Sequence, residues 1–260
     1  MTMEKTEIDI SETYQDLLPE LKSFVYRLTC DKEESGDIAQ DTFIKVIEKK
    51  NQFKNQSSIK TWIFSIATNI ALDWLRKKKR WAETAQDECK AFAQSDQVYK
   101  TAFLEIQANS PAGSFDFREH INFCFTCIAK TLTIEQQLAL ILKDIYDFKT
   151  IEISFVLNSP EGTIKHWLFT ARKFMTEIFD RRCALINKNG ACHQCSELNG
   201  LFNPKQQIQE NIIIQTANHK REDYYMVRAK LVKAIDPLNS SGSDLEDEIM
   251  QVLRKSISDK

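Results

Sequence analysis

A line of chemically active side chains recurs every three or four residues over one stretch of the chain. It comprises Trp62, Ser65, Asn69, Asp73, Arg76 and Arg80. In a helix this spacing places all of them on one face. An aromatic ring can stack on an unpaired base, short polar side chains can reach base edges, and guanidinium groups hold phosphates. The face therefore suits nucleic acid, and the alternative is a solvated helix face with a basic last turn.

Two amphipathic helices would present this face. The first is predicted to begin at Ser35 as N-cap, with Asp37 in the first turn. Its polar side carries Asp37, Gln40, Asp41, Ile44 and Glu48. The second is predicted from Ile59 to Arg80, with Ile63, Ile66, Ala67, Ile70 and Trp74 turned inward. Cations at its end, Lys77 and Lys78 among them, extend the nucleic-acid face.

An earlier helix is predicted to complete a small helical domain with these two. It runs from Ser11 to Cys30, and Pro19 is expected in its first turns, where a missing N–H costs little. We place the first domain at residues 1–82.

A second helical domain is predicted at residues 118–182. Thr133 and Gln136 form a capping box, and Asn158 suits a left-handed turn. The helix after that turn has one apolar stripe, made of Ile164, Leu168, Ala171, Met175 and Ile178. This is the shape of a helix-turn-helix, whose second helix enters the major groove, although an ordinary helical hairpin has the same spacing. The outward positions in the first half of this helix are Glu161, Thr163, Lys165, His166 and Phe169, and Arg172 and Lys173 follow at positions that suit phosphates. Of these, the residues expected to meet DNA are Thr163, Lys165, His166, Arg172 and Lys173.

The composition restricts the class of protein. The chain has 260 residues, a formal net charge of −2, 6 glycines and 5 prolines. Few glycines and prolines favour long helices, and the charge excludes a uniformly basic DNA-binding protein. The first residues resemble no signal peptide and no apolar run is long enough for a membrane span, so we expect a cytoplasmic chain without membrane insertion.

The remaining segments are a linker and an extension. Residues 83–117 read as a linker that contains Ser110-Pro111-Ala112-Gly113-Ser114, and residues 183–260 as a helical extension. The extension contains a set of potential metal ligands, Cys183, Cys192, Cys195 and His193. Because a second Cys-x-x-Cys is missing, we favour free or redox-responsive thiols over zinc and expect no metal or cofactor. Cys124 and Cys127 are expected in the core.

Two stretches resemble a known family. DIAQDTFIKVIE followed by SSIKTWIFSIATNIALDWLRKKKR resembles the second conserved region of bacterial sigma factors, in particular the extracytoplasmic-function group. SPEGTIKHWLFTARKFM resembles their fourth conserved region. Asn158 stands where glycine is usual, a change that the turn is expected to tolerate. Ser154 stands where alanine is commoner, so the hairpin is expected to pack slightly differently. The extension lies outside the resemblance.

The resemblance implies roles for particular residues. Asp37, Gln40 and Asp41 match the face that contacts RNA polymerase. Trp62, Asn69, Asp73 and Arg76 match the side that opens the downstream promoter element. The loop from Phe53 to Ser58 matches one that captures an extruded base, and the helix-turn-helix would read the upstream element.

We therefore predict an all-α sigma factor: two small helical domains on a linker, with a helical C-terminal extension. It would direct RNA polymerase core to promoter DNA, would be no enzyme, and would be open to control by an anti-sigma factor. One rival is a helix-turn-helix regulator that works without polymerase. Another is a thiol- or zinc-dependent interaction protein whose basic faces are only solvated.

Overall fold

The computed structural model describes residues 10–54, 56–78, 80–82, 84, 117–182 and 221–240, and the single residues 247, 250, 251 and 254. The described part is helical and contains no strand, which confirms the predicted fold class. The interior of the predicted linker and the cysteine set of the extension lie outside the described residues. No helix among those described is both long enough and apolar enough to cross a bilayer.

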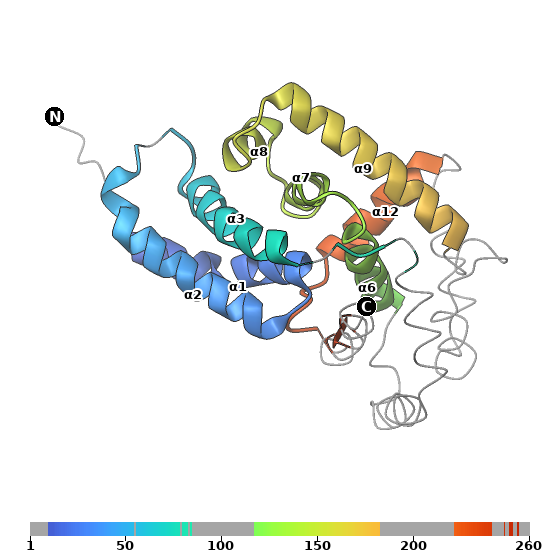
Figure 1. Cartoon of the computed structure of the whole chain (residues 1–260), viewed down its shortest axis with the longest axis horizontal. Helices are drawn as coiled ribbons and strands as arrows, with labels where there is room; N and C mark the ends of the chain where they lie inside the picture. Colours follow the sequence, from blue (N-terminus) through green and yellow to red (C-terminus); the bar gives the residue numbers. More distant parts are fainter. Residues whose placement is uncertain are drawn as a thin grey trace.

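The N-terminal domain consists of three long helices that pack against one another, at the left of Figure 1. These are α1 (Ile10–Thr29), α2 (Lys32–Lys49) and α3 (Ile59–Lys77), with a 3-10 turn, η1 (Lys50–Gln52), after α2. Cys30 takes a left-handed conformation (φ 57°) between α1 and α2. Ser58 caps α3 by accepting a hydrogen bond from the backbone N–H of Thr61 at 3.0 Å.

Three details of this domain differ from prediction. The second helix begins at Lys32, because Asp31 accepts from the N–H of Glu34 and serves as N-cap, and Ser35 is buried inside the helix. Pro19 lies in the middle of α1 rather than in its first turns. It is exposed, so water can reach the carbonyl that loses its donor. The third helix ends at Lys77, and Arg80 is outside it.

The helix-turn-helix domain contains α6 (Phe117–Ala129), α7 (Ile134–Asp144), α8 (Thr150–Val156) and α9 (Glu161–Arg182). The capping box of Thr133 and Gln136 is present, as predicted. Asn158 has a φ of 46° between α8 and α9, which confirms the left-handed turn. The predicted apolar stripe of α9 is buried along its whole length, and so are Cys124 and Cys127.

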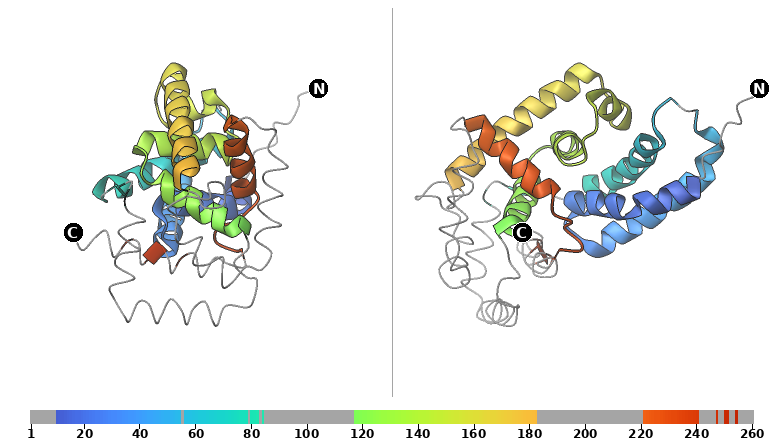
Figure 2. Two further views of the ribbon diagram at one scale, coloured as in Figure 1. Left: turned by 90° about the vertical axis from the view of Figure 1, so that its right-hand side faces the viewer. Right: turned by 180° about the vertical axis from the view of Figure 1, so that it is seen from behind.

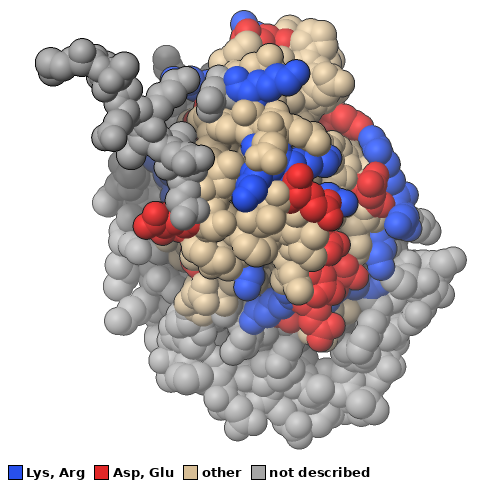
Figure 3. Space-filling model, turned by 90° about the vertical axis from the view of Figure 1, so that its left-hand side faces the viewer, with Lys and Arg blue, Asp and Glu red and all other residues tan. Residues whose placement is uncertain are grey.

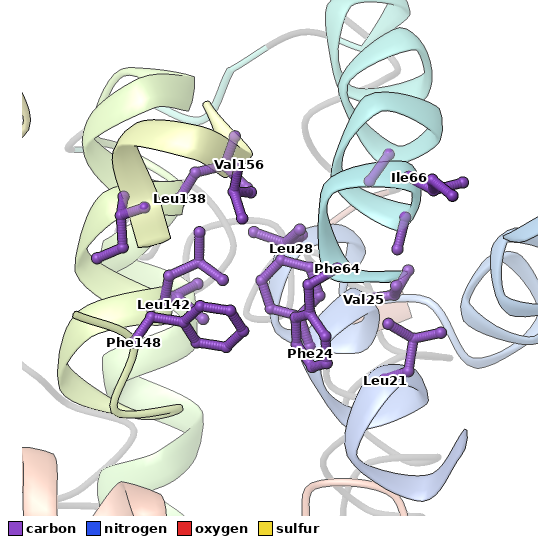
Figure 4. Close-up of a cluster of buried hydrophobic side chains, with 14 of the residues drawn as sticks. Leu21, Phe24, Val25, Leu28, Phe64, Ile66, Leu138, Leu142, Phe148 and Val156 are labelled. Atoms are coloured by element: carbon purple, nitrogen blue, oxygen red, sulfur yellow. The ribbon is translucent and has the colours of Figure 1, made fainter. Parts of the chain in front are cut away.

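The two domains share one hydrophobic core. Figure 4 shows Phe24 and Phe64 of the N-terminal domain facing Leu142 and Phe148 of the helix-turn-helix domain. The ring centroids of Phe64 and Phe148 are 5.0 Å apart, and Tyr146 meets Phe24 edge-on at 5.5 Å. The described parts of the chain therefore form a closed arrangement rather than two separate bodies.

Polar contacts cross the same joint. Thr61 of α3 donates to Glu152 of α8 at 3.2 Å. Lys130, which is buried, donates to the carbonyls of Leu28 and Thr29 at the end of α1, both at 3.2 Å. These carbonyls have no partner within the helix, so the ammonium completes its C-terminus. Burial lowers the pKa of Lys130 from its ordinary value.

A helix of the C-terminal extension packs over the helix-turn-helix domain. Helix α12 (Arg221–Lys233) belongs to the C-terminal extension, and Figures 1 and 2 show it beside α6 and α9. It contributes Tyr225, Ala229 and Val232 to a second buried cluster that also contains Phe125 and Phe179.

Candidate nucleic-acid interface

The predicted face of α3 is largely open to solvent. Asn69, Asp73 and Arg76 are exposed, and Asp73 and Arg76 form a surface ion pair at 3.6 Å. Trp62 is half-buried: it packs on the core and against Phe53, with ring centroids 5.1 Å apart. The ring at the start of α3 is thus held in place by the loop that precedes the helix, while the amide of Asn69 and the Asp73–Arg76 ion pair are exposed to solvent.

The basic end of α3 divides into two parts. Lys77 and Lys78 are exposed, and the ammonium of Lys78 lies 5.0 Å from the ring centre of Trp74. Arg80 instead donates to the carbonyls of Leu132 and Ala129 at the end of α6, at 2.6 and 3.3 Å. Burial is the main cause that lowers the pKa of Arg80, to about 10. The structure therefore places Arg80 in the joint between the domains.

The polar side of α2 is exposed as predicted. Asp37, Gln40 and Asp41 all face solvent. Ile44, one turn further on, is 46% exposed and so does not gain the free energy of burial. The sequence had already indicated this exposure, because Ile44 is an apolar residue on the polar side of the predicted helix. Acidic, amide and apolar groups together suit a protein partner better than nucleic acid.

The helix-turn-helix presents its second helix to solvent. Lys165, His166 and Lys173 of α9 are exposed and Thr163 is half-buried. Phe169, which lies between the two lysines along the helix, is 69% exposed, in agreement with its predicted outward position. A ring on this face can contact thymine methyl groups.

The turn between α8 and α9 shows how Ser154 is accommodated. Its hydroxyl donates to the carbonyl of Ser159 at 2.6 Å, and the N–H of Ser159 bonds the carbonyl of Ser154 at 3.1 Å. The hydroxyl that replaces the commoner methyl group therefore ties the two ends of the turn together.

Arg172 has a different environment from the one predicted. Its guanidinium makes two bonds to the carboxylate of Asp144, from Nε to Oδ2 at 3.0 Å and from Nη2 to Oδ1 at 2.5 Å. The phenol of Tyr225 donates to the same carboxylate at 2.6 Å. The bond to Asp144 raises the pKa of Arg172. Arg172 thus joins α9 to α7 and α12, and a buried carboxylate compensates its charge.

We expect Arg172→Ala to reduce stability more than DNA binding. Asp144 is only 3% exposed, so losing its partner leaves a buried carboxylate with the Tyr225 hydroxyl alone. The cost should be about 2–3 kcal/mol, below that of a fully buried pair because Arg172 is 38% exposed. Urea unfolding measures it, with Lys173→Ala as the exposed neighbouring control. If Arg172→Ala loses no more stability than the control and binds DNA more weakly, Arg172 contacts DNA as the sequence predicted.

Charges of both signs are mixed on the end of the molecule that carries the loop between α2 and α3. Figure 3 shows acidic and basic side chains interspersed with uncharged ones on this face. A uniform electrostatic attraction to DNA is absent from this described surface, so binding there depends on particular residues.

Comparisons with known proteins agree with this geometry. Residues 13–81 match the family model for sigma-70 region 2, and residues 123–175 match that for sigma-70 region 4. The ECF RNA polymerase sigma factor SigW of Bacillus subtilis is 30% identical over 169 residues, which are 64% of this chain and 84% of SigW. The chain belongs to the ECF group of the sigma-70 family.

Two other similar proteins also match about two thirds of this chain. The sigma factor SigM of Bacillus subtilis is 26% identical over 172 residues, covering 66% of this chain and 96% of SigM. The sigma factor RpoE of Bartonella quintana, solved in complex with the anti-sigma factor NepR, is similar over 65% of this chain and 95% of its own, with a TM-score of 0.45 and 22% identity. The region 4 match of this sigma factor ends before α12, so the contacts of the extension lie outside both family models.

Proposed function

We infer that this sigma factor directs bacterial RNA polymerase core to promoter DNA at the start of transcription. The observation that carries the inference is the pair of chemically different exposed faces on one N-terminal domain: acidic and apolar on α2, aromatic, amide and cationic on α3. One face suits a protein and the other an unpaired DNA strand. We also propose the domain boundaries 1–82 and 118–182, a cytoplasmic location, and no catalytic role of its own.

We assign the α3 face to strand opening. Trp62 supplies a ring for stacking on an unpaired base, Asn69 supplies an amide for base edges, and Arg76 with Lys77 and Lys78 supplies phosphate contacts. Duplex binding is assigned to α9, where Lys165, His166 and Lys173 are exposed beside Thr163 and Phe169. Phosphates and base edges are then met by different side chains of one helix.

We assign the α2 face to RNA polymerase. Gln40→Ala combined with Asp41→Ala should weaken binding to core polymerase, while the free energy of unfolding should change by no more than about 0.5 kcal/mol, because exposed sites contribute little. Titration of labelled core enzyme measures the first effect and urea unfolding the second. Lys49→Ala is a suitable control, because Lys49 is exposed on the same helix and does not belong to its polar side. Undiminished polymerase binding by the Gln40/Asp41 variant would rule out this assignment.

Transcription in vitro tests the function as a whole. Bacterial core polymerase is assayed with and without this protein on fragments of the source genome, and the transcript starts are mapped. We expect starts that depend on the protein. Fragments that the protein binds equally well without polymerase, and that yield no dependent start, would favour a polymerase-independent helix-turn-helix regulator instead. An anti-sigma factor is a further partner that we propose on the basis of the family.

A further inference from the structure

The C-terminal extension makes a buried contact with the helix-turn-helix domain. Tyr225, Ala229 and Val232 of α12 are at most 2% exposed. The ring of Tyr225 lies 6.4 Å from that of Phe125 in α6, and the guanidinium of Arg228 lies 4.6 Å from the ring centre of Phe179 in α9. Tyr225 also bonds Asp144 of α7, and its pKa is raised by burial first and by Asp144 next, so the phenol stays protonated and donates. Three helices of that domain are thus in contact with one face of α12.

The other end of α12 is attached to the N-terminal domain. Arg27 of α1 donates through Nη2 to the carbonyls of Val232 and Ile235, at 2.9 and 2.7 Å. Val232 lies in the last turn of α12 and Ile235 follows its end, and the N–H of Ile235 also donates to the carbonyl of Val232 at 3.2 Å. Arg27 itself is 1% exposed. Further along the extension, Arg254 pairs with Asp31, the N-cap of α2. Breaking the contact would expose apolar surface and leave polar groups unpaired at both domains.

We propose that α12, with Ile235 and Arg254, is an intramolecular latch that keeps the two DNA-binding domains closed in the free protein. The chain between Thr84 and Phe117 has a maximum reach of roughly 110 Å, so covalent connection alone does not hold the domains together. Non-covalent contacts hold the two domains together instead, and the latch contacts both of them.

The consequence for activity rests on the proposed function. A sigma factor that engages two separate promoter elements must move its two domains apart, whereas here Phe64 and Phe148 are 5.0 Å apart and Thr61 bonds Glu152. A partner that binds only the open state has its apparent affinity reduced by the fraction of open molecules. The latch therefore lowers the affinity of the free protein for polymerase, and weakening the latch should raise it.

Two variants of the full chain weaken the latch in different ways. Tyr225→Phe, Lys233→Gln and Arg254→Gln together remove its polar contacts with Asp144, Asp147 and Asp31 without adding a charge to the core. Ala229→Glu places a carboxylate on the buried face of α12. Met226→Glu is the matched control, because it adds the same charge to the same helix at a position that is 44% exposed.

Hydrogen exchange and polymerase titration give independent readouts. In both latch variants the amides of α12 should exchange roughly 5–150-fold faster. The concentration of core polymerase that gives half-saturation should fall by a similar factor. Met226→Glu should leave both quantities unchanged. Circular dichroism checks that each variant keeps its helices; if Ala229→Glu loses them, the triple variant decides.

Two results would overturn the latch. The first is exchange of α12 amides in the triple variant at the rate of the unmodified chain. The second is faster exchange without tighter polymerase binding, which would make the contact structural only. Failure of every chain to bind polymerase, the unmodified one included, would count against the proposed function, and exchange would still report whether α12 is held.

Discussion

Trp62→Ala should impair promoter opening and leave the initial closed complex largely intact. The indole stands at the start of the α3 face, braced by Phe53 with ring centroids 5.1 Å apart. Stacking on an unpaired base contributes about 1–3 kcal/mol, which corresponds to roughly 5–150-fold in the equilibrium between closed and open complexes. Permanganate footprinting of unpaired thymines on a duplex promoter measures the open fraction.

Three controls separate opening from packing. Trp62→Phe keeps a ring that can stack, so it should retain most of the activity. Lys77→Ala combined with Lys78→Ala should weaken promoter binding evenly across sequences and reduce its salt dependence, because those cations meet phosphates. A template with a pre-melted bubble should reduce the defect of Trp62→Ala. If Trp62→Ala opens a duplex promoter as well as the unmodified protein does, the indole serves only to pack on Phe53 and the core.

Phe64→Ala should be the most destabilising single change at the joint. The ring is fully buried, and its centroid lies 5.1 Å from that of Phe24, 6.0 Å from Tyr146 and 5.0 Å from Phe148. Truncating a buried phenylalanine costs about 3–5 kcal/mol, a large share of the 5–15 kcal/mol that is typical of a whole domain. Urea unfolding measures the loss.

The same position tests whether the domains are coupled. If they share one core in solution, Phe64→Ala and Phe148→Ala should be non-additive by about 0.5–3 kcal/mol in a double-mutant cycle. Phe155→Ala serves as the control, because Phe155 is 41% exposed on α8. Strictly additive losses for Phe64 and Phe148 would mean that the two domains stabilise themselves separately.

Local interactions explain why much of this structure could be predicted from the sequence. A capping box involves residues three apart, so Thr133 and Gln136 were sufficient to identify the start of α7. Asn158 marked its left-handed turn for the same reason, since the conformational preference belongs to the residue itself. Helical periodicity likewise separated the buried stripe of α9 from its exposed side. It also placed Gln40 and Asn69 at the surface.

Partners distant in sequence were decided by the tertiary structure alone. Periodicity shows which side of a helix is polar, but it cannot show which group will neutralise a charge on that side. Arg172 was therefore assigned to phosphates from its position on α9, whereas folding brings it to Asp144, and Tyr225 of the extension to the same carboxylate. Arg80 similarly extended a run of cations in the sequence, yet the chain leaves the helix at Lys77 and carries it to the end of α6.

The closed arrangement of the two domains had no local signal at all. Each domain has an apolar pattern of its own, and that pattern gave no indication that Phe64 and Phe148 would meet. The sequence analysis did not single out Arg27, and only the fold shows that it donates to the carbonyls of Val232 and Ile235. The spacing of the nearest few residues along the chain determines which side of a helix is apolar. Which surface packs against that side depends on shape and hydrogen bonding across the whole molecule.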